Sequence, residues 1–127
     1  MLYSPYQTYQ QRSAETATPI QLVLMLYDGA IRFTRQGMEA TAIQNYEQAN
    51  LGYCKAEAIV NELMASLNFS YPISKDLVRI YEYVLHQLIQ ANVYKKTAPA
   101  EEALHHLMEL RDAWKQIASP SSIQKQA

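Results

Sequence analysis

The residues best suited to metal or acid-base chemistry lie near the C-terminal end of the chain. Glu102 and His105 form a Glu-x-x-His pair, and two such pairs with two further glutamates build the di-metal carboxylate sites of some four-helix bundles. Only one such pair occurs in the sequence. Glu82 and His86 are four residues apart, which is the spacing of an ordinary pair on a helix surface. The pattern therefore argues against a di-metal site, although a metal-binding four-helix bundle oxidase remains an alternative that metal analysis of the purified protein would test.

The other candidates for chemistry stand alone. His105 and His106 are adjacent, so their side chains point about 100° apart on a helix and make a poor chelating pair. Cys54 belongs to no nucleophile motif, and we expect it to be a small buried apolar residue. No glycine-rich phosphate-binding loop is present. The sequence thus predicts neither an enzyme nor a bound cofactor or metal.

Composition sets the class of protein. The chain has 127 residues, is 49% hydrophobic and carries a formal net charge of -1, as expected of one soluble domain. With 11 Lys+Arg against 12 Asp+Glu and no basic run, it lacks the charge pattern of a nucleic-acid or anionic-membrane binder. It also shows no membrane-spanning stretch and no N-terminal secretion signal. We therefore expect a cytoplasmic protein, and the single cysteine fits a reducing compartment.

The N-terminal segment is polar except for three tyrosines at three-residue intervals, Tyr3, Tyr6 and Tyr9. Tyrosine carries a large apolar ring with a polar tip and is common in contact surfaces. Because the neighbouring residues offer no apolar core, we expect these rings to dock on the rest of the chain or on a partner.

Apolar residues recur every three or four positions, and only three glycines occur, so the sequence predicts an all-α chain. The expected helices are Pro19–Thr41, Tyr46–Leu67, Lys75–Lys96 and a fourth that begins at Thr97 and ends at Ser119. Thr18 and Gln21 should form a capping box at the first helix, and Ser74 should cap the third. Gly29 and Gly37 should mark close helix–helix approaches.

Short connections between these helices predict an antiparallel up-down four-helix bundle with an N-terminal arm or short helix packed on it. The expected organisation is an N-terminal arm over residues 1–18, a helical bundle over 19–119 and a flexible C-terminal tail over 120–127. Trp114 should belong to the bundle core.

The chain has more apolar residues than one core stripe per helix can hold. Six apolar residues run consecutively from Leu22 to Tyr27, so some must face outward or into a groove. Asp28 follows this run and could make a polar contact at the rim of that groove. The helix around Tyr81 and Leu88 is similarly broad. We expect grooves that accept a partner helix or extended peptide, and through which the free protein could form a weak homodimer.

Several segments resemble, in order, motifs of the flagellar secretion chaperones. They are Tyr6-Gln7-Thr8-Tyr9, Thr16-Ala17-Thr18-Pro19, the Leu22–Ala30 segment with Met25-Leu26-Tyr27-Asp28-Gly29, Leu63–Asn68, Tyr81-Glu82-Tyr83, Gln90-Ala91-Asn92 and Arg111-Asp112-Ala113-Trp114-Lys115-Gln116-Ile117. The resemblance covers Pro5 to Ile117. The chain departs from the family at His86-Gln87, where many members place two arginines, and in its aromatic Phe69–Pro72 loop.

The resemblance implies a cytoplasmic export chaperone. Such a protein would bind the disordered C-terminal segment of flagellin, prevent its premature polymerisation and deliver it to the flagellar export gate. The resemblance does not imply a role for ATP. Apolar grooves and the resemblance together point to these partner-binding residues: Tyr6, Tyr9, Leu22, Met25, Leu26, Tyr27, Asp28, Tyr81 and Leu88. A generic helical adaptor with no flagellar client is a further alternative.

Overall fold

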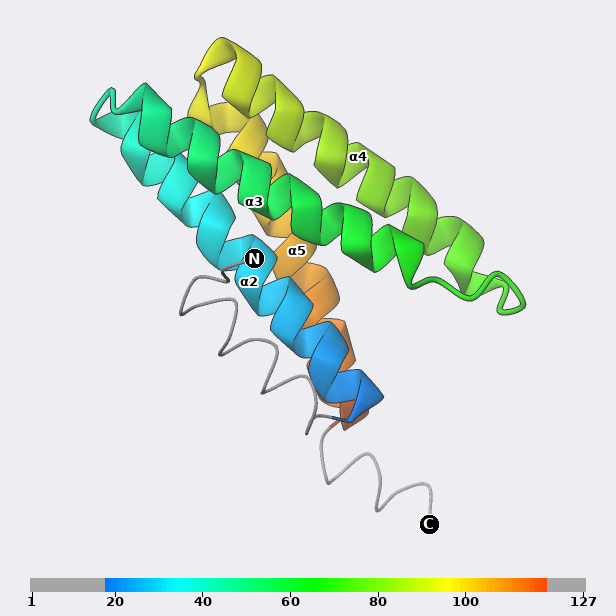
Figure 1. Ribbon diagram of the computed structural model, residues 1–127. Coiled ribbons are helices and arrows are strands. Elements are labelled where there is room, and N and C mark those ends of the chain that lie inside the picture. The colour runs from blue at the N-terminus through cyan, green and yellow to red at the C-terminus, as the bar shows by residue number, and fades with distance from the viewer. Residues whose placement is uncertain (1–17, 119–127) are drawn as a thin grey trace, which may run out of the picture.

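The computed structural model describes residues 18–118, which form four α-helices and no β-strand within that range (Figure 1). The helices are α2, Pro19–Ala42; α3, Tyr46–Ala65; α4, Ile73–Tyr94; and α5, Thr97–Ala118. α2 and α4 each pack against both α3 and α5, so consecutive helices are neighbours and α2 lies diagonally opposite α4. The predicted all-α antiparallel four-helix bundle is confirmed. The predicted arm, apart from Thr18, and the predicted tail lie outside the described residues.

The predicted start of the first helix is confirmed in detail. The backbone N–H of Gln21 donates to Thr18 Oγ1 at 3.2 Å, and the backbone N–H of Thr18 donates to Gln21 Oε1 at 2.9 Å. This reciprocal capping box satisfies backbone donors that the first turn of a helix leaves open. Pro19 follows the cap, where its missing N–H costs nothing.

The limits of α3 and α4 differ from the prediction by two residues. α3 ends at Ala65, and α4 begins at Ile73 with Pro72 as its N-cap. Ser74 is therefore not a cap: it lies inside α4, is buried, and its Oγ donates to the carbonyl of Asn68 at 2.7 Å. α4 ends at Tyr94 because Lys95 adopts a left-handed conformation, with φ 53°, that no right-handed helix can continue.

Two glycines bring α2 and α3 into direct backbone contact. A Cβ atom at Gly52 would lie 2.8 Å from the backbone nitrogen of Gly37 and 2.9 Å from the carbonyl oxygen of Phe33. A Cβ atom at Gly37 would lie 2.6 Å from the ring of Tyr53, which is fully buried. The predicted close approach at Gly37 is confirmed, and Gly52 is its partner on α3. Gly29 is buried in α2.

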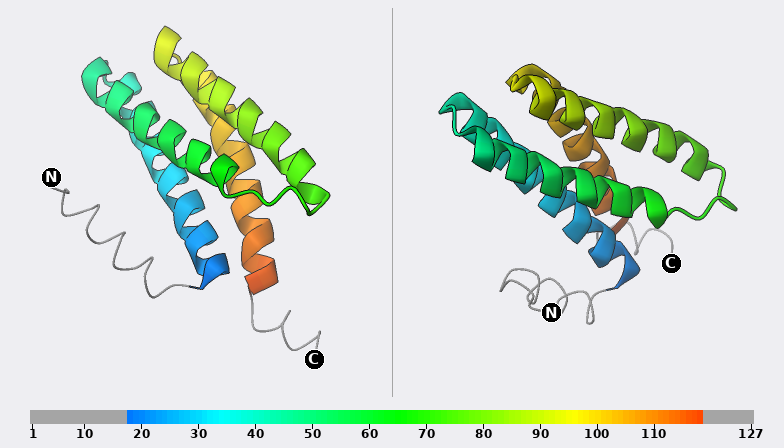
Figure 2. Two further views of the ribbon diagram at one scale, coloured as in Figure 1. Left: turned by 45° about the vertical axis from the view of Figure 1, so that its right-hand side comes forward. Right: turned by 45° about the horizontal axis from the view of Figure 1, so that its top comes forward.

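The four helices lie close together at one end of the bundle, the closed end, and diverge at the other, the open end. Figures 1 and 2 show α3 running beside α4, while the N-terminal end of α2 and the C-terminal end of α5 diverge from the α3–α4 connection. The α2–α3 turn and the α4–α5 turn lie together at the opposite, closed end. The elements at the open end position the candidate site.

Replacing Gly52 by alanine should destabilise the bundle although alanine favours helices. The added methyl group would meet backbone atoms, which cannot move as a flexible side chain can, and overpacking costs typically about 1–3 kcal/mol. The gain in helix propensity offsets about 1 kcal/mol of this. Because the methyl group would lie within 2.9 Å of two backbone atoms, the overpacking cost should fall in the upper part of that range, at about 2–3 kcal/mol. We therefore expect a net loss of about 1–2 kcal/mol in urea unfolding, whereas Asn61→Ala on the exposed face of α3 should stay within about 0.5 kcal/mol of the parent. An unchanged or raised stability of Gly52→Ala would contradict the close approach.

Candidate partner-binding site

Two tyrosines from diagonally opposite helices meet inside the open half of the bundle. Tyr27 of α2 is 0% exposed and Tyr81 of α4 is 2% exposed, and their hydroxyl oxygens lie 2.5 Å apart. The rings are tilted by 48° with centroids 6.4 Å apart. A buried hydroxyl without a partner is costly, and each of these hydroxyls serves as partner to the other.

Burial keeps this pair of hydroxyls protonated. It raises the pKa of Tyr27 far above its usual value, and the adjacent Tyr81 adds to that rise, which Trp114 opposes slightly. Burial likewise raises the pKa of Tyr81. At neutral pH one hydroxyl therefore donates while the other accepts, and the pair links α2 to α4 without a buried charge.

A cleft opens beside Tyr81 between the diverging helices, and we call it the open-end cleft. Its volume is about 250 Å³. The lining residues come from all four helices and the α3–α4 connection: Val23, Leu63, Ser66, Leu67, Asn68, Tyr71, Ile73, Ser74, Leu77, Tyr81 and Trp114. None of these is charged. The cleft therefore offers a chiefly apolar surface that suits apolar side chains.

Several polar groups of the open-end cleft are already engaged within the chain. Ser66 Oγ donates to the carbonyl of Leu63 at 2.8 Å, as Ser74 Oγ does to that of Asn68. Asn68 Oδ1 accepts from the backbone N–H of Ser70 at 3.0 Å. These bonds hold the α3–α4 connection in place. Because each serine hydroxyl has only one proton, neither can also donate a hydrogen bond to a ligand.

Large apolar side chains stand at the rim of the cleft. Tyr71 and Ile73 are each 62% exposed, and the neighbouring Phe69 is 57% exposed. Exposed apolar side chains that gather beside a cleft commonly mark an interaction surface. The aromatic loop noted in the sequence thus contributes directly to the site.

An ion pair ties α2 to α5 next to the buried tyrosines. Arg111 Nη1 lies 3.4 Å from Asp28 Oδ1, and Arg111 Nη2 lies 3.4 Å from Asp112 Oδ1. Asp28 is exposed, so this pair contributes only about 0–1 kcal/mol to stability. The ion pair nevertheless fixes the position of the Asp28 carboxylate, which directly follows the apolar run Leu22–Tyr27.

The structure separates the predicted partner-binding residues into three groups. Tyr27, Tyr81 and Leu88 are buried in the core, and of these three Tyr81 also lines the open-end cleft. Leu22, Met25 and Leu26 are half-buried and Asp28 is exposed, so these four remain accessible. Tyr6 and Tyr9 lie outside the described residues. Tyr27 and Leu88 are both 0% exposed in this structure, and their part in binding a partner stays a prediction.

Two further expectations were wrong in part or in whole. Trp114 is half-buried rather than fully in the core, and it lines the open-end cleft. Cys54 is exposed, with its Sγ 3.5 Å from Asn50 Oδ1. The reason is its position on α3: Tyr53 and Ala56 face the core, and Cys54 is rotated about 100° from Tyr53 around the helix.

The histidines of α5 pair with glutamates on their own helix. His106 Nε2 lies 3.2 Å from Glu102 Oε1, and His105 Nε2 lies 3.1 Å from Glu109 Oε1, both at i,i+4 spacing. Glu102 also accepts a hydrogen bond from the hydroxyl of Tyr83 at 3.2 Å. Among residues 18–118, no group of three or more His, Cys, Asp or Glu side chains could hold a metal ion. Glu102 and His105 thus belong to two separate pairs on the helix surface rather than to one site.

Comparison with known protein families gives one clear match. Residues 2–121 match the family described as flagellar protein FliS. The chain belongs to this family.

Curated relatives and a solved structure agree with this FliS assignment. The flagellar secretion chaperone FliS of Bacillus subtilis (strain 168) is 37% identical over 115 residues, which cover 91% of this chain and 86% of the relative. The chaperone of the same name from Escherichia coli (strain K12) is 30% identical over 126 residues and 93% of each chain. A crystal structure of a bacterial flagellar chaperone shares the fold with a TM-score of 0.73, at 21% identity, and covers 89% of this chain and 94% of that one.

The site brings together three of the segments that resemble FliS chaperones. Tyr27 and Asp28 belong to the Leu22–Ala30 segment, Tyr81 begins Tyr81-Glu82-Tyr83, and Arg111 begins the closing signature that contains Trp114. The Tyr27–Tyr81 hydrogen bond and the Asp28–Arg111 ion pair connect them. No helix in residues 18–118 has the length and apolar character needed to cross a membrane.

The stability losses from removing the two hydroxyls of the buried pair should not be additive. Tyr27→Phe leaves the Tyr81 hydroxyl buried without its partner, and we expect a loss of about 1–3 kcal/mol. Tyr81→Phe should behave similarly. The double variant has no stranded hydroxyl, so its loss in urea unfolding should be clearly smaller than the sum of the two single losses.

Tyr94→Phe is a matched control, because Tyr94 is 64% exposed on the same helix as Tyr81. It should leave stability unchanged within about 0.5 kcal/mol. Strictly additive losses in the Tyr27 and Tyr81 variants would show that the two hydroxyls do not depend on each other.

Proposed function

We propose that this chain is a cytoplasmic, non-enzymatic export chaperone that binds the disordered C-terminal segment of flagellin. It prevents premature polymerisation of flagellin and delivers it to the flagellar export gate. The observation that carries the proposal is the uncharged, apolar open-end cleft, in a chain that belongs to the FliS family. The names of the curated relatives, flagellar secretion chaperones, support the same role.

The chemistry of the cleft fits such a client. A segment destined to form helices in a filament carries apolar side chains that need cover before assembly, and the cleft offers them an apolar surface beside Trp114 and Tyr81. Val23 lines the cleft and belongs to the half-buried run from Leu22 to Leu26. This run extends the apolar surface beyond the cleft. A long surface is needed because a disordered client gives up conformational entropy when it binds.

The candidate residues then have distinct roles. Leu22, Met25 and Leu26 contact the client, and Asp28 makes a polar contact at the rim. Tyr27, Tyr81 and Leu88 act from within the core by holding α2 and α4 at the spacing that keeps the cleft open. In this proposal the N-terminal arm, with Tyr6 and Tyr9, covers part of the client surface until flagellin displaces it.

A charge at the rim of the cleft should weaken flagellin binding. Ile73 lines the cleft and is 62% exposed, so Ile73→Glu places a carboxylate beside the client with little effect on folding. We expect binding to full-length flagellin, measured by calorimetry, to weaken by about tenfold or more, since a buried unpaired charge costs several kcal/mol. Flagellin that lacks its C-terminal segment should not co-purify with the parent protein.

Val93→Glu is the matched control, because Val93 is 65% exposed on the same helix, at the end away from the cleft. It should bind flagellin as the parent does. If flagellin without its C-terminal segment still co-purified fully with the parent protein, that segment would not be the part that the chain binds. Equal binding by the two glutamate variants would instead reject the cleft as its site.

The arm should take part in client exchange. The variant with both Tyr6→Ala and Tyr9→Ala removes the two rings that align with the family's arm. If the arm covers the client surface, its loss should change calorimetric affinity for a flagellin C-terminal peptide by at least about threefold, because removing a competing contact or a client contact each shifts the equilibrium. Tyr3→Ala serves as the control and should leave the affinity unchanged. An identical affinity for the parent and the double variant would remove the arm from the mechanism.

A further inference from the structure

A second depression lies between α2 and α5, and we call it the arginine depression. Its volume is about 460 Å³. Three arginines and two carboxylates stand among its lining residues, which are Asp28, Ile31, Arg32, Arg35, Gln36, Glu39 and Arg111. It shares no lining residue with the open-end cleft, so the two depressions are distinct.

The charged side chains that α2 contributes to this depression share one face of the helix. From the N-terminal end of α2 they are Asp28, Arg32, Arg35 and Glu39, at intervals of four, three and four residues. All four residues are exposed. The face therefore carries two positive charges at its centre and one negative charge at each end.

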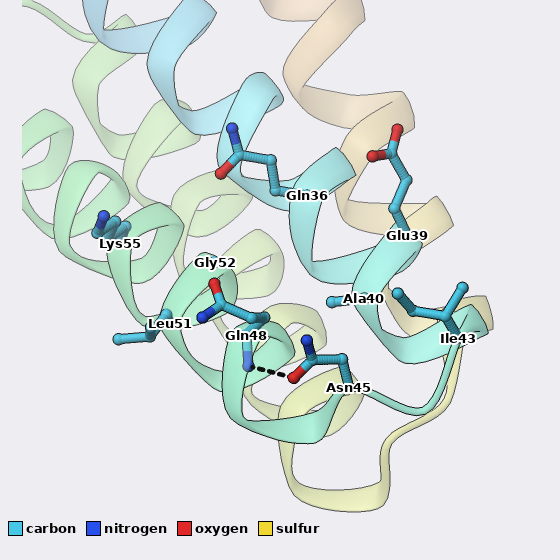
Figure 3. Close-up of a pocket in the computed structure, with 9 residues that line it drawn as sticks. All are labelled: Gln36, Glu39, Ala40, Ile43, Asn45, Gln48, Leu51, Gly52 and Lys55. Atoms are coloured by element: carbon cyan, nitrogen blue, oxygen red, sulfur yellow. Dashed lines mark hydrogen bonds between the residues drawn. The ribbon is translucent and has the colours of Figure 1, made fainter.

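A larger depression of about 520 Å³ borders this surface at the closed end, between α2 and α3 (Figure 3). Gln36 and Glu39 line both depressions, and Figure 3 shows them on α2 at the edge of the larger one. The charged residues of the larger depression are Glu39 and Lys55, so its lining has no net charge. The arginine depression, in contrast, has an excess of positive charge, and Glu39 marks its boundary.

The arginines of the depression differ in how they are paired within the chain. Arg111 contacts both Asp28 and Asp112, so its charge is balanced. Arg35 Nη2 donates to the thioether sulfur of Met108 at 3.5 Å, and such a sulfur is a weak acceptor. In the described part of the chain, no carboxylate lies within ion-pair distance of Arg35. Because a guanidinium group has several N–H donors, Arg35 retains donors for a ligand.

Arg32 places a second positive charge one helical turn from Arg35. Its guanidinium carbon lies 5.1 Å from the ring centroid of Phe33. Side chains three residues apart on a helix are neighbours, and like charges at such spacing destabilise the helix. Negative groups that pair with both guanidinium groups would relieve this repulsion and form charge-assisted hydrogen bonds.

We propose that the arginine depression binds an acidic segment of a partner protein, which presents two carboxylates about one helical turn apart to Arg32 and Arg35. The planar guanidinium group matches the geometry of a carboxylate. The carboxylates of Asp28 and Glu39 at the two ends of the face repel further negative charge. A nucleic acid, which carries a charge at every phosphate, therefore fits this face less well than a short acidic segment.

Binding at this site does not depend on the client that occupies the open-end cleft. Because exposed ion pairs contribute little each, the site alone should hold an acidic peptide only weakly, with a roughly millimolar dissociation constant. Charge pairs of this kind raise the association rate and fix the orientation of a larger partner.

NMR titration of the isotope-labelled full chain with capped tetraglutamate tests this site. The side-chain N–H resonances of Arg32 and Arg35 should shift saturably, whereas capped tetralysine should not shift them. Arg35→Gln should weaken tetraglutamate binding by about threefold or more, as followed by the backbone resonances of α2, because it removes one ion pair.

Arg79→Gln is the matched control, because Arg79 is exposed on α4, diagonally opposite α2. It should bind tetraglutamate as the parent does, and thermal melts would confirm that each variant is folded. A short oligothymidylate of equal charge should bind less tightly than tetraglutamate. The proposal is overturned if tetraglutamate leaves the Arg32 and Arg35 resonances unshifted, if Arg35→Gln binds it as the parent does, or if the oligothymidylate binds as tightly or more tightly.

Discussion

The open half of this bundle depends on one hydrogen bond, which joins the buried hydroxyls of Tyr27 and Tyr81. Tyr27 and Tyr81 lie on diagonally opposite helices, yet their buried hydroxyls are hydrogen-bonded to each other. The pair therefore fixes how far α2 stands from α4 at the level where the helices begin to diverge. Beyond it the helices no longer close on one another, and the space between them becomes the cleft that Tyr81 and Trp114 line.

The two ends of the bundle solve different physical problems. At the closed end Gly37 and Gly52 let α2 and α3 touch through their backbones, and the exposed surface there combines apolar side chains with one charge of each sign. At the open end no charged residue lines the cleft. An uncharged surface suits a partner that is held through many apolar contacts.

Much of the fold could be predicted from local sequence signals, because those signals act within one or two helical turns. The Thr18–Gln21 capping box and the apolar spacing gave the helices to within about two residues. The errors have local causes that side-chain type does not reveal, such as the left-handed Lys95 and the use of Ser74 to hold Asn68 rather than to cap α4. The site was harder to predict. A run such as Leu22–Tyr27 shows that apolar surface is in excess, but only the packing shows that Tyr27 faces inward while Leu22 remains accessible, or that Tyr71 and Trp114 come together across the cleft.

The chain carries its own probe for a client that occupies the open-end cleft. Trp114 is the single tryptophan, is half-buried and lines the cleft, so its fluorescence reports directly on what enters. Titration with a tryptophan-free peptide of the flagellin C-terminal segment should produce a saturable shift of the Trp114 emission to shorter wavelength, as water leaves its surroundings, with the same midpoint as calorimetric binding. Calorimetric binding that leaves the Trp114 emission unchanged would contradict this site and place the client elsewhere on the chain.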